Sequence, residues 1–278
     1  MVECIGLENR SPFTGTGGSN PSASAVSPSC KTDFINSKLY MLSIKNLTIQ
    51  AKQEKILHDI SINFDQTKIY AIMGVNGSGK SSLAKSIMGD NSFNIAHGDI
   101  FLDNKNINNL RSNERAKNGI FLSPQSPISI PGVTVNQLLR TALPHSIINS
   151  KNLIQKIKNT ANKLEIPEKL LTRSLNENFS GGERKKMEVL QMAILNPKYI
   201  ILDEIDTGVD IDALKIIATF LRDFITDTKK TLILITHYNR ILSYLPVDKV
   251  IIMNDGKIIQ TGTASLAKKI ERDGYQQI

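Results

Sequence analysis

Residues 74–82 read GVNGSGKSS and fit the phosphate-binding pattern G-x-x-x-x-G-K-[ST]. The apolar run IYAIM at residues 69–73 comes directly before them and predicts a buried strand. A helical pattern follows, with Leu83, Ile87 and Met88 on one face. Strand, glycine loop and helix together are the context that favours a phosphate cradle over a glycine-rich turn without a ligand.

Such a loop closes its backbone N–H groups around phosphate oxygens, and the helix N-terminus adds favourable partial charge. Lys80 is expected to reach the β- and γ-phosphates of ATP, and the Ser81 hydroxyl is expected to bind Mg²⁺. The predicted nucleotide-binding residues of this loop are Gly74, Asn76, Gly77, Ser78, Gly79, Lys80, Ser81 and Ser82.

The composition sets bounds on the rest. The chain has 278 residues, 40% of them hydrophobic, which suits one large domain or a domain with an insertion. No apolar stretch approaches the length of a membrane span, and the N-terminus lacks the pattern of a secretory signal. The net charge is +8, but the lysines are scattered rather than striped, so no nucleic-acid partner is expected. Direct membrane insertion is not expected either.

The two cysteines, Cys4 and Cys30, lie in a Ser-, Gly- and Pro-rich segment, residues 1–40, that differs from the remainder. We expect this segment to be a flexible tail outside the fold, and the functional domain to span residues 41–278. A cysteine-free core suits a reducing compartment, so a cytoplasmic location is expected, or an organelle stroma if the tail is a transit segment.

Short strand patterns occupy residues 42–50, 55–64, 69–73 and 98–107, and helical periodicity dominates from about 130 to 195. Strands return at residues 199–203 and 231–236, and a hairpin turns through Asn254-Asp255-Gly256. The layout predicts a parallel α/β core of the P-loop NTPase type, with an antiparallel β subdomain and an inserted α-helical subdomain.

The run YIILDE at residues 199–204 predicts a buried parallel strand with carboxylates at its C-terminal end. Asp203 would hold Mg²⁺ through water, and Glu204 would activate the attacking water as general base. Gln125, restrained between two prolines, would contact Mg²⁺ and that water. His237, at the end of the strand TLILIT, would hydrogen-bond the γ-phosphate.

Ser180, Gly181 and Gly182 precede a strong helix and predict a second anion site at its N-terminus. They also predict a capping box between Ser180 and Glu183, and both roles can hold together. One chain cannot easily bring two phosphate cradles onto one ATP, whereas two chains packed head to tail can. Asp206 and Asp210 are expected at such an interface, with simple turn formation as the alternative.

These strings, in this order, resemble the ATP-binding cassette family over residues 42–265. The resemblance implies a two-lobed cassette and an ATP-dependent homodimer. In each composite site Lys80, Gln125, Asp203, Glu204 and His237 would face Ser180–Gly182 of the other chain. One departure stands out: residues 49–55 read IQAKQEK, without the aromatic that usually stacks on adenine, so base stacking is expected to be weak.

The strings DEIDTGVDIDALKI, IPGVTVNQLL, SGGERKKMEVLQMAIL and THYNRIL are closely similar to the SufC family. This resemblance implies an ATPase that drives iron–sulfur cluster assembly on the scaffold proteins SufB and SufD. The alternative is the nucleotide-binding subunit of a membrane transporter. Repair and translation ATPases carry long insertions or tandem cassettes, which this chain lacks. The loop at residues 127–133, with Ile130 at its centre, is expected to dock the scaffold, or else to be a buried connector.

Overall fold

The structure is a computed structural model that describes residues 41–144, 151–237 and 240–275. All of these residues belong to one compact unit beginning at Lys38. The prediction of a flexible tail falls on residues 1–40, which lie outside the described residues.

The strands have the following bounds: β1 Met41–Ala51, β2 Glu54–Asp65, β3 Ile69–Met73, β4 Asn94–Leu102, β5 Lys105–Asn106, β6 Ile120–Ser123, β7 Ile130–Thr134, β8 Ser174–Leu175, β9 Tyr199–Asp203, β10 Thr231–Ile235, β11 Lys249–Asn254 and β12 Lys257–Gly262. The helices are α1 Lys80–Met88, α2 Ser112–Lys117, α3 Val135–Ala142, α5 Lys151–Lys163, α6 Glu168–Leu171, α7 Gly181–Leu195, α8 Ile211–Thr228 and α9 Ala264–Asp273, with a 3₁₀ turn η1 at Ile241–Tyr244.

Within the described ranges the strands form three sheets: β12-β11-β3-β10-β9-β6, β2-β1-β4-β5, and the pair β7-β8. The first is parallel except for the antiparallel edge strand β12, and the second is antiparallel throughout. The predicted combination of a parallel core with an antiparallel subdomain is confirmed. The predicted strand 98–107 is wrong in its bounds, because a turn at Asp103 and Asn104, both with positive φ, separates β4 from β5.

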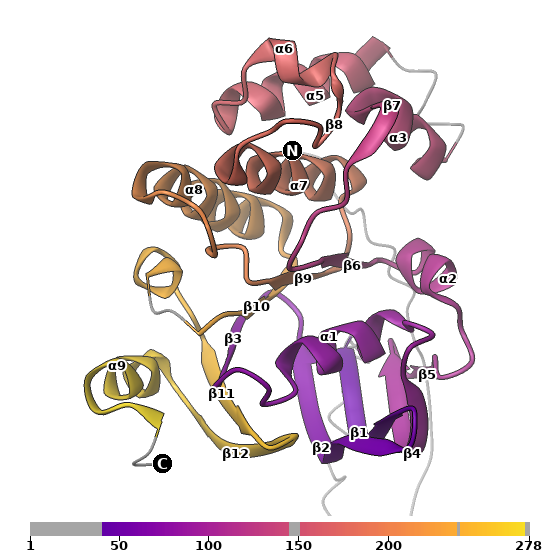
Figure 1. Cartoon of the computed structure of the whole chain (residues 1–278), viewed down its shortest axis with the longest axis vertical. Coiled ribbons are helices and arrows are strands. Elements are labelled where there is room, and N and C mark those ends of the chain that lie inside the picture. The colour runs from indigo at the N-terminus through magenta and orange to yellow at the C-terminus, as the bar shows by residue number, and fades with distance from the viewer. Residues whose placement is uncertain (1–40, 145–150, 238–239, 276–278) are drawn as a thin grey trace, which may run out of the picture. The chain divides into compact units, whose positions relative to one another are not determined.

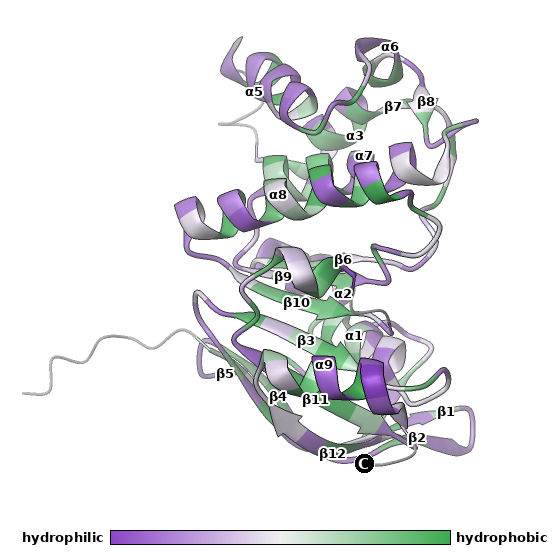
Figure 2. Cartoon of the chain, turned by 90° about the vertical axis from the view of Figure 1, so that its left-hand side faces the viewer, coloured by the Kyte–Doolittle hydropathy of each residue, from purple (hydrophilic) through white to green (hydrophobic). Residues whose placement is uncertain are grey.

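The strands of the parallel sheet are apolar on both faces because the sheet lies between two hydrophobic cores. In β3, Ile69, Ala71 and Met73 join the core built with α7 and α8. Tyr70 and Ile72 join the other core, with α1 and the antiparallel sheet. In Figure 2 the inner strands β11, β3, β10 and β9 are mainly green, whereas the edge strand β12 and helix α5 carry many hydrophilic residues. Continuous apolar runs are therefore what this position in the fold requires.

Helices α3, α5 and α6 lie on the side of α7 away from the parallel sheet, within the segment predicted to be a helical insertion (Figure 1). Leu153, Ile157 and Ala161 of α5 recur at helical spacing and are buried in the core that α7 shares. None of the helices in the described part of the chain is long and apolar enough to cross a membrane.

Candidate functional site

The predicted site residues follow neighbouring strands of the parallel sheet. The loop 74–82 follows β3, His237 follows β10, Asp203 and Glu204 stand at the end of β9, and Gln125 follows β6. These four strands are adjacent in the order β3-β10-β9-β6 and run parallel. Their carboxyl ends therefore meet at one edge, where ligands of open α/β sheets bind.

A cavity of about 240 Å³ opens at this edge. It is lined by Asn76, Gly77, Gly79, Lys80, Ser81, Ser82, Gln125 and Glu204. The structure thus brings most of the predicted phosphate loop together with the predicted base and the predicted Gln. It does not bring Ser180, Gly181 or Gly182 to this cavity, whose lining includes none of them.

Two glycines of the loop are required by close packing. A Cβ on Gly74 would lie 2.2 Å from the carbonyl oxygen of Met253, so no other residue fits there. Gly79 has φ 96° and forms the N-cap of α1, and a Cβ on it would meet Leu57 at 2.8 Å. Both glycines are therefore needed for the loop to pack against β11 and β2.

Lys80 is almost fully buried and turns back onto its own loop. Its Nζ donates to the Gly74 carbonyl at 2.9 Å, to the Val75 carbonyl at 2.8 Å and to the Ser78 hydroxyl at 3.3 Å. Burial lowers the pKa of Lys80, and the two carboxylates that end β9 oppose this shift. The ammonium group is therefore held at the loop by two carbonyl oxygens and one hydroxyl.

The loop is also tied to the C-terminal hairpin. The backbone N–H of Gly256, in the turn between β11 and β12, donates to the Ser78 carbonyl at 3.1 Å. The Gly256 carbonyl in turn accepts from the His58 N–H at 2.9 Å. One residue of this turn thereby joins the phosphate loop to strand β2 of the antiparallel sheet.

Asp203 fits the metal-binding role predicted for it. It is buried, and its Oδ1 has no hydrogen-bond partner among the described residues. Burial raises the pKa of Asp203, and the neighbouring Ser81 hydroxyl opposes that shift. The described residues hold no group of three or more His, Cys, Asp or Glu side chains that could bind a metal ion. A cation bound by Ser81 and Asp203 would therefore take its remaining ligands from phosphate oxygens and water, as Mg²⁺ does in phosphoryl-transfer sites.

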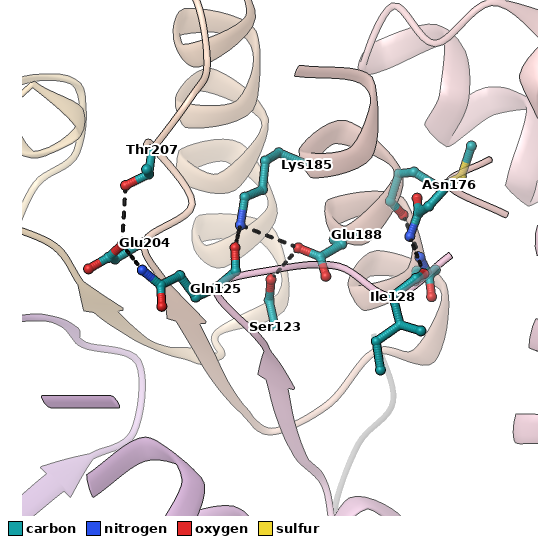
Figure 3. Close-up of polar contacts among 10 residues, drawn as sticks. Ser123, Gln125, Ile128, Asn176, Lys185, Glu188, Glu204 and Thr207 are labelled. Carbon is teal, nitrogen blue, oxygen red and sulfur yellow. Dashed lines mark hydrogen bonds and ion pairs between the residues drawn. The ribbon is translucent and has the colours of Figure 1, made fainter. Parts of the chain in front are cut away.

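Glu204 receives several contacts at once. The Gln125 amide Nε2 donates to its Oε2 at 2.6 Å, and the Thr207 hydroxyl donates to the same oxygen at 3.4 Å (Figure 3). The His237 Nδ1 lies 3.5 Å from its Oε1. The backbone of Glu204 has φ 50°, and its N–H donates to the Ile235 carbonyl at 2.9 Å. The side chains of Gln125 and His237 thus both lie at the carboxylate of Glu204, the predicted base.

The predicted capping box at the second cradle is confirmed. Ser180 Oγ accepts from the Glu183 N–H at 3.2 Å, and Glu183 Oε2 accepts from the Ser180 N–H at 2.7 Å. A Cβ on Gly181 would lie 2.5 Å from the Gly208 carbonyl, so this glycine is needed where the start of α7 passes the loop after Glu204.

Asp206 and Asp210 have partners inside the chain. Thr236 Oγ1 donates to Asp206 Oδ2 at 2.7 Å, and Asp210 Oδ1 caps α8 by accepting from the Ala213 N–H at 2.8 Å. Asp206 is thus bonded to the residue that follows β10, and Asp210 is the N-cap of α8. These contacts leave the interface hypothesis as a prediction.

Sequence reasoning missed a buried polar group beneath Gln125. Ser123 Oγ donates to Glu188 Oε2 at 2.5 Å, and Lys185 Nζ donates to the Gln125 carbonyl at 2.9 Å (Figure 3). Lys185 and Glu188 lie one turn apart on α7, with Nζ and Oε2 separated by 3.9 Å. Opposite charges at this spacing are usual on exposed helix faces, so the sequence offered no sign that these two are buried.

The loop after Gln125 differs from its prediction at one residue. Ile130 is half-buried and packs against the main core, as the connector alternative predicted. Ile128 is 74% exposed, and its carbonyl accepts from the buried Asn176 side chain at 2.9 Å. The exposed apolar side chain of this loop is therefore Ile128.

Comparison with known proteins gives a consistent set of relatives. Residues 57–207 match the family described as ABC transporter. The probable ATP-dependent transporter ycf16 of Trieres chinensis is 42% identical over 249 residues, covering 87% of this chain and 99% of that protein. A probable ABC transporter ATP-binding protein of Streptococcus pyogenes serotype M3 is 39% identical over 243 residues, covering 86% of this chain and 94% of that protein.

Solved structures of ATP-binding cassettes have the same fold as this chain. A nucleotide-free ATP-binding cassette from an ABC transporter superposes with a TM-score of 0.70 and 25% identity, covering 84% of this chain and 96% of that one. A dimeric cassette in a post-hydrolysis state, bound to ADP and Pi, has the same fold with a TM-score of 0.69 at 21% identity, covering 80% of this chain and 98% of that one.

Proposed function

This chain belongs to the ABC transporter family of ATP-binding cassette ATPases, and from that premise we propose that it hydrolyses MgATP to drive iron–sulfur cluster assembly on a SufB–SufD scaffold. The proposal has two parts. The first assigns the individual site residues, and the second assigns the partner. Each has its own support.

The assignment of the phosphate site is supported by the cavity that joins the glycine loop to Gln125 and Glu204. Lys80 would move from the Gly74 and Val75 carbonyls to the β- and γ-phosphate oxygens, because a charge-assisted bond to phosphate is stronger than one to a carbonyl. The N-terminus of α1 adds its partial positive charge.

The water that attacks the γ-phosphate needs a base, and Glu204 is the carboxylate within reach of the cavity. Its Oε2 accepts from the Gln125 amide in this structure, so Gln125 helps to orient the carboxylate that would take the water's proton. His237 lies on the other oxygen, Oε1, where it orients the carboxylate and can donate towards the γ-phosphate. Mg²⁺, when bound by Ser81, Asp203 and Gln125, neutralises charge on the phosphate oxygens.

A head-to-tail homodimer is supported by the separation of the two cradles within one chain. Ser180, Gly181 and Gly182 do not line the cavity that Lys80 lines. They would therefore meet the ATP held by a second copy. One cassette of the same fold was solved as a dimer.

The proposed partner is supported by one observation: the segments DEIDTGVDIDALKI and THYNRIL, at the two strand ends that carry Glu204 and His237, resemble the SufC family. The alternative, a nucleotide-binding subunit of a membrane transporter, has support of its own. The relatives from Trieres chinensis and Streptococcus pyogenes bear the names of transporter components. Both candidates share the chemistry and differ in the protein that is driven.

The exposed Ile128 provides a test of the partner. Its loop is held by Asn176, and an exposed isoleucine on a restrained loop suits a buried contact in a complex. Ile128→Asp should weaken co-purification with a purified SufB–SufD scaffold by about a hundredfold, because a charge is then buried in the interface. The control is Ile259→Asp, which places the same charge on another exposed isoleucine, in β12.

Co-purification should fail for Ile128→Asp and persist for Ile259→Asp, with ATPase activity near normal in both. Equal scaffold binding by both variants would contradict docking through this loop. Capture of the unmutated chain by a membrane permease, with no binding to SufB–SufD, would favour the transporter alternative.

A further inference from the structure

The segment that carries Gln125 is attached to helix α7 by two hydrogen bonds, both made to buried side chains of that helix. Ser123 ends strand β6 and donates to Glu188 at 2.5 Å. Two residues later the Gln125 carbonyl accepts from Lys185 at 2.9 Å. Glu188 and Lys185 are only 6% and 4% exposed, and the Ser123–Glu188 bond is itself buried, so water does not compete for that bond.

These two bonds determine where the Gln125 amide can lie. The segment is held at Ser123 and at the Gln125 carbonyl, so the side chain of Gln125 extends from a fixed backbone towards Glu204, which it contacts at 2.6 Å. Figure 3 shows two sets of contacts. Glu188 contacts Ser123, and Lys185 contacts the carbonyl of Gln125, whose side chain contacts Glu204. The helix that supplies them begins at Gly181, directly after Ser180 of the second cradle.

We propose that Glu188 is a positioning residue for ATP hydrolysis, which holds Ser123 and so keeps the Gln125 amide in register with Glu204. Glu188 does not line the cavity, so it acts through the loop and not on the reacting atoms. The inference rests on the roles proposed above for Gln125 and Glu204. The inference adds Glu188, a residue of α7, to the site residues already proposed in the phosphate loop, after β6 and at the end of β9.

The first test is Ser123→Ala, which removes the donor to Glu188 and leaves every residue of the cavity in place. We expect kcat to fall about tenfold, because small displacements of a catalytic group cost one to two orders of magnitude in rate. KM for ATP should stay within about threefold, because the contacts to the phosphates come from the loop 74–82. Glu188→Gln keeps an acceptor oxygen at the same reach and should retain most of the activity.

A matched control separates positioning from stability. Ser43, in β1, also donates from a buried hydroxyl, to Asn63 Oδ1 at 2.6 Å, in the antiparallel sheet. Ser43→Ala should also lower the melting temperature, because it too removes one short hydrogen bond made by a buried serine hydroxyl. It should leave kcat unchanged. Equal melting losses with an unchanged kcat in both variants would overturn the proposal.

The decisive measurement is a double-mutant cycle. If Ser123 acts through the Gln125 amide, adding Ser123→Ala to Gln125→Ala should not lower kcat further, although it should still lower the melting temperature. Independent, multiplicative losses would overturn the positioning role and leave the role of Gln125 intact. An unchanged kcat for Gln125→Ala alone would overturn the role of Gln125 and, with it, this inference.

Discussion

Glu204 combines its predicted role as general base with an uncommon backbone conformation. Its φ of 50° lies in the left-handed region, where a residue with a Cβ costs about 1–3 kcal/mol at sites held in strain. The hydrogen bond from its N–H to Ile235 of the neighbouring strand helps to hold it there. This turn directs the backbone away from β9 directly after Asp203, so the two carboxylates take different surroundings.

Lys80 supplies the sharpest prediction at this scale. Lys80→Ala should weaken ATP binding by at least about a hundredfold, because two or more charge-assisted hydrogen bonds to phosphate are lost. Titration with a fluorescent ATP analogue measures this directly. The control is Lys117→Ala, which removes an exposed lysine on α2. Undiminished binding by Lys80→Ala would contradict the assignment of the phosphate loop.

At the scale of elements, helix α1 depends on a buried arginine at its C-terminal end. Arg115 is 2% exposed and donates to the carbonyls of Ser86 and Ile87 in α1, and to those of Asn108 and Leu110 in the preceding loop. Burial lowers the pKa of Arg115. The negative end of the helix macrodipole and the unsatisfied carbonyls there favour a cation in this position.

Arg115→Ala should lower the free energy of unfolding by about 3 kcal/mol or more, because it leaves several buried carbonyls unpaired and opens a cavity. Arg115→Lys should cost less, since an ammonium group restores up to three of the donors. Urea unfolding monitored by circular dichroism gives both values. Arg140→Ala, on an exposed position of α3, should change the free energy by no more than about 0.5 kcal/mol.

The elements show what sequence patterns can and cannot predict here. The strands β3, β9 and β10 were predictable because four or five apolar residues in a row are typical of a buried parallel strand. The phosphate loop and the capping box at Ser180 were predictable because their residue types are fixed by local geometry. Arg115, Lys185 and Glu188 were not, because the burial of a charged residue depends on which distant segment covers it.

At the scale of the whole molecule, the separation of the two predicted phosphate sites within one chain predicts a dimer that ATP holds together and hydrolysis releases. Glu204→Gln should bind ATP but not hydrolyse it, since an amide orients water without accepting its proton. The ATP-bound dimer should then accumulate, and size-exclusion chromatography with light scattering should show it in MgATP but not in MgADP. A variant that stays monomeric at saturating ATP would contradict the head-to-tail arrangement.

Residues 1–40 provide a second prediction at this scale. Their Ser-, Gly- and Pro-rich composition and few large apolar residues predict a small contribution to the core. Deleting them should therefore leave ATPase activity unchanged and the melting temperature within about 2 °C. A larger fall in the melting temperature, measured by differential scanning fluorimetry, would show that this segment packs on residues 41–278.

Because the turn at Gly256 supports the phosphate loop, the site can form only after this late part of the chain has been synthesised. The phosphate loop is complete in sequence by residue 82. Its first glycine, Gly74, packs against Met253, and its Ser78 carbonyl accepts a hydrogen bond from the Gly256 N–H. Both supports are translated more than 170 residues later, and β11, which carries one of them, is also a neighbour of β3. A growing chain on the ribosome therefore carries an unsupported loop until almost all of it has been made. Termination between residues 82 and 253 would yield a product that retains the motif and lacks both of these supports.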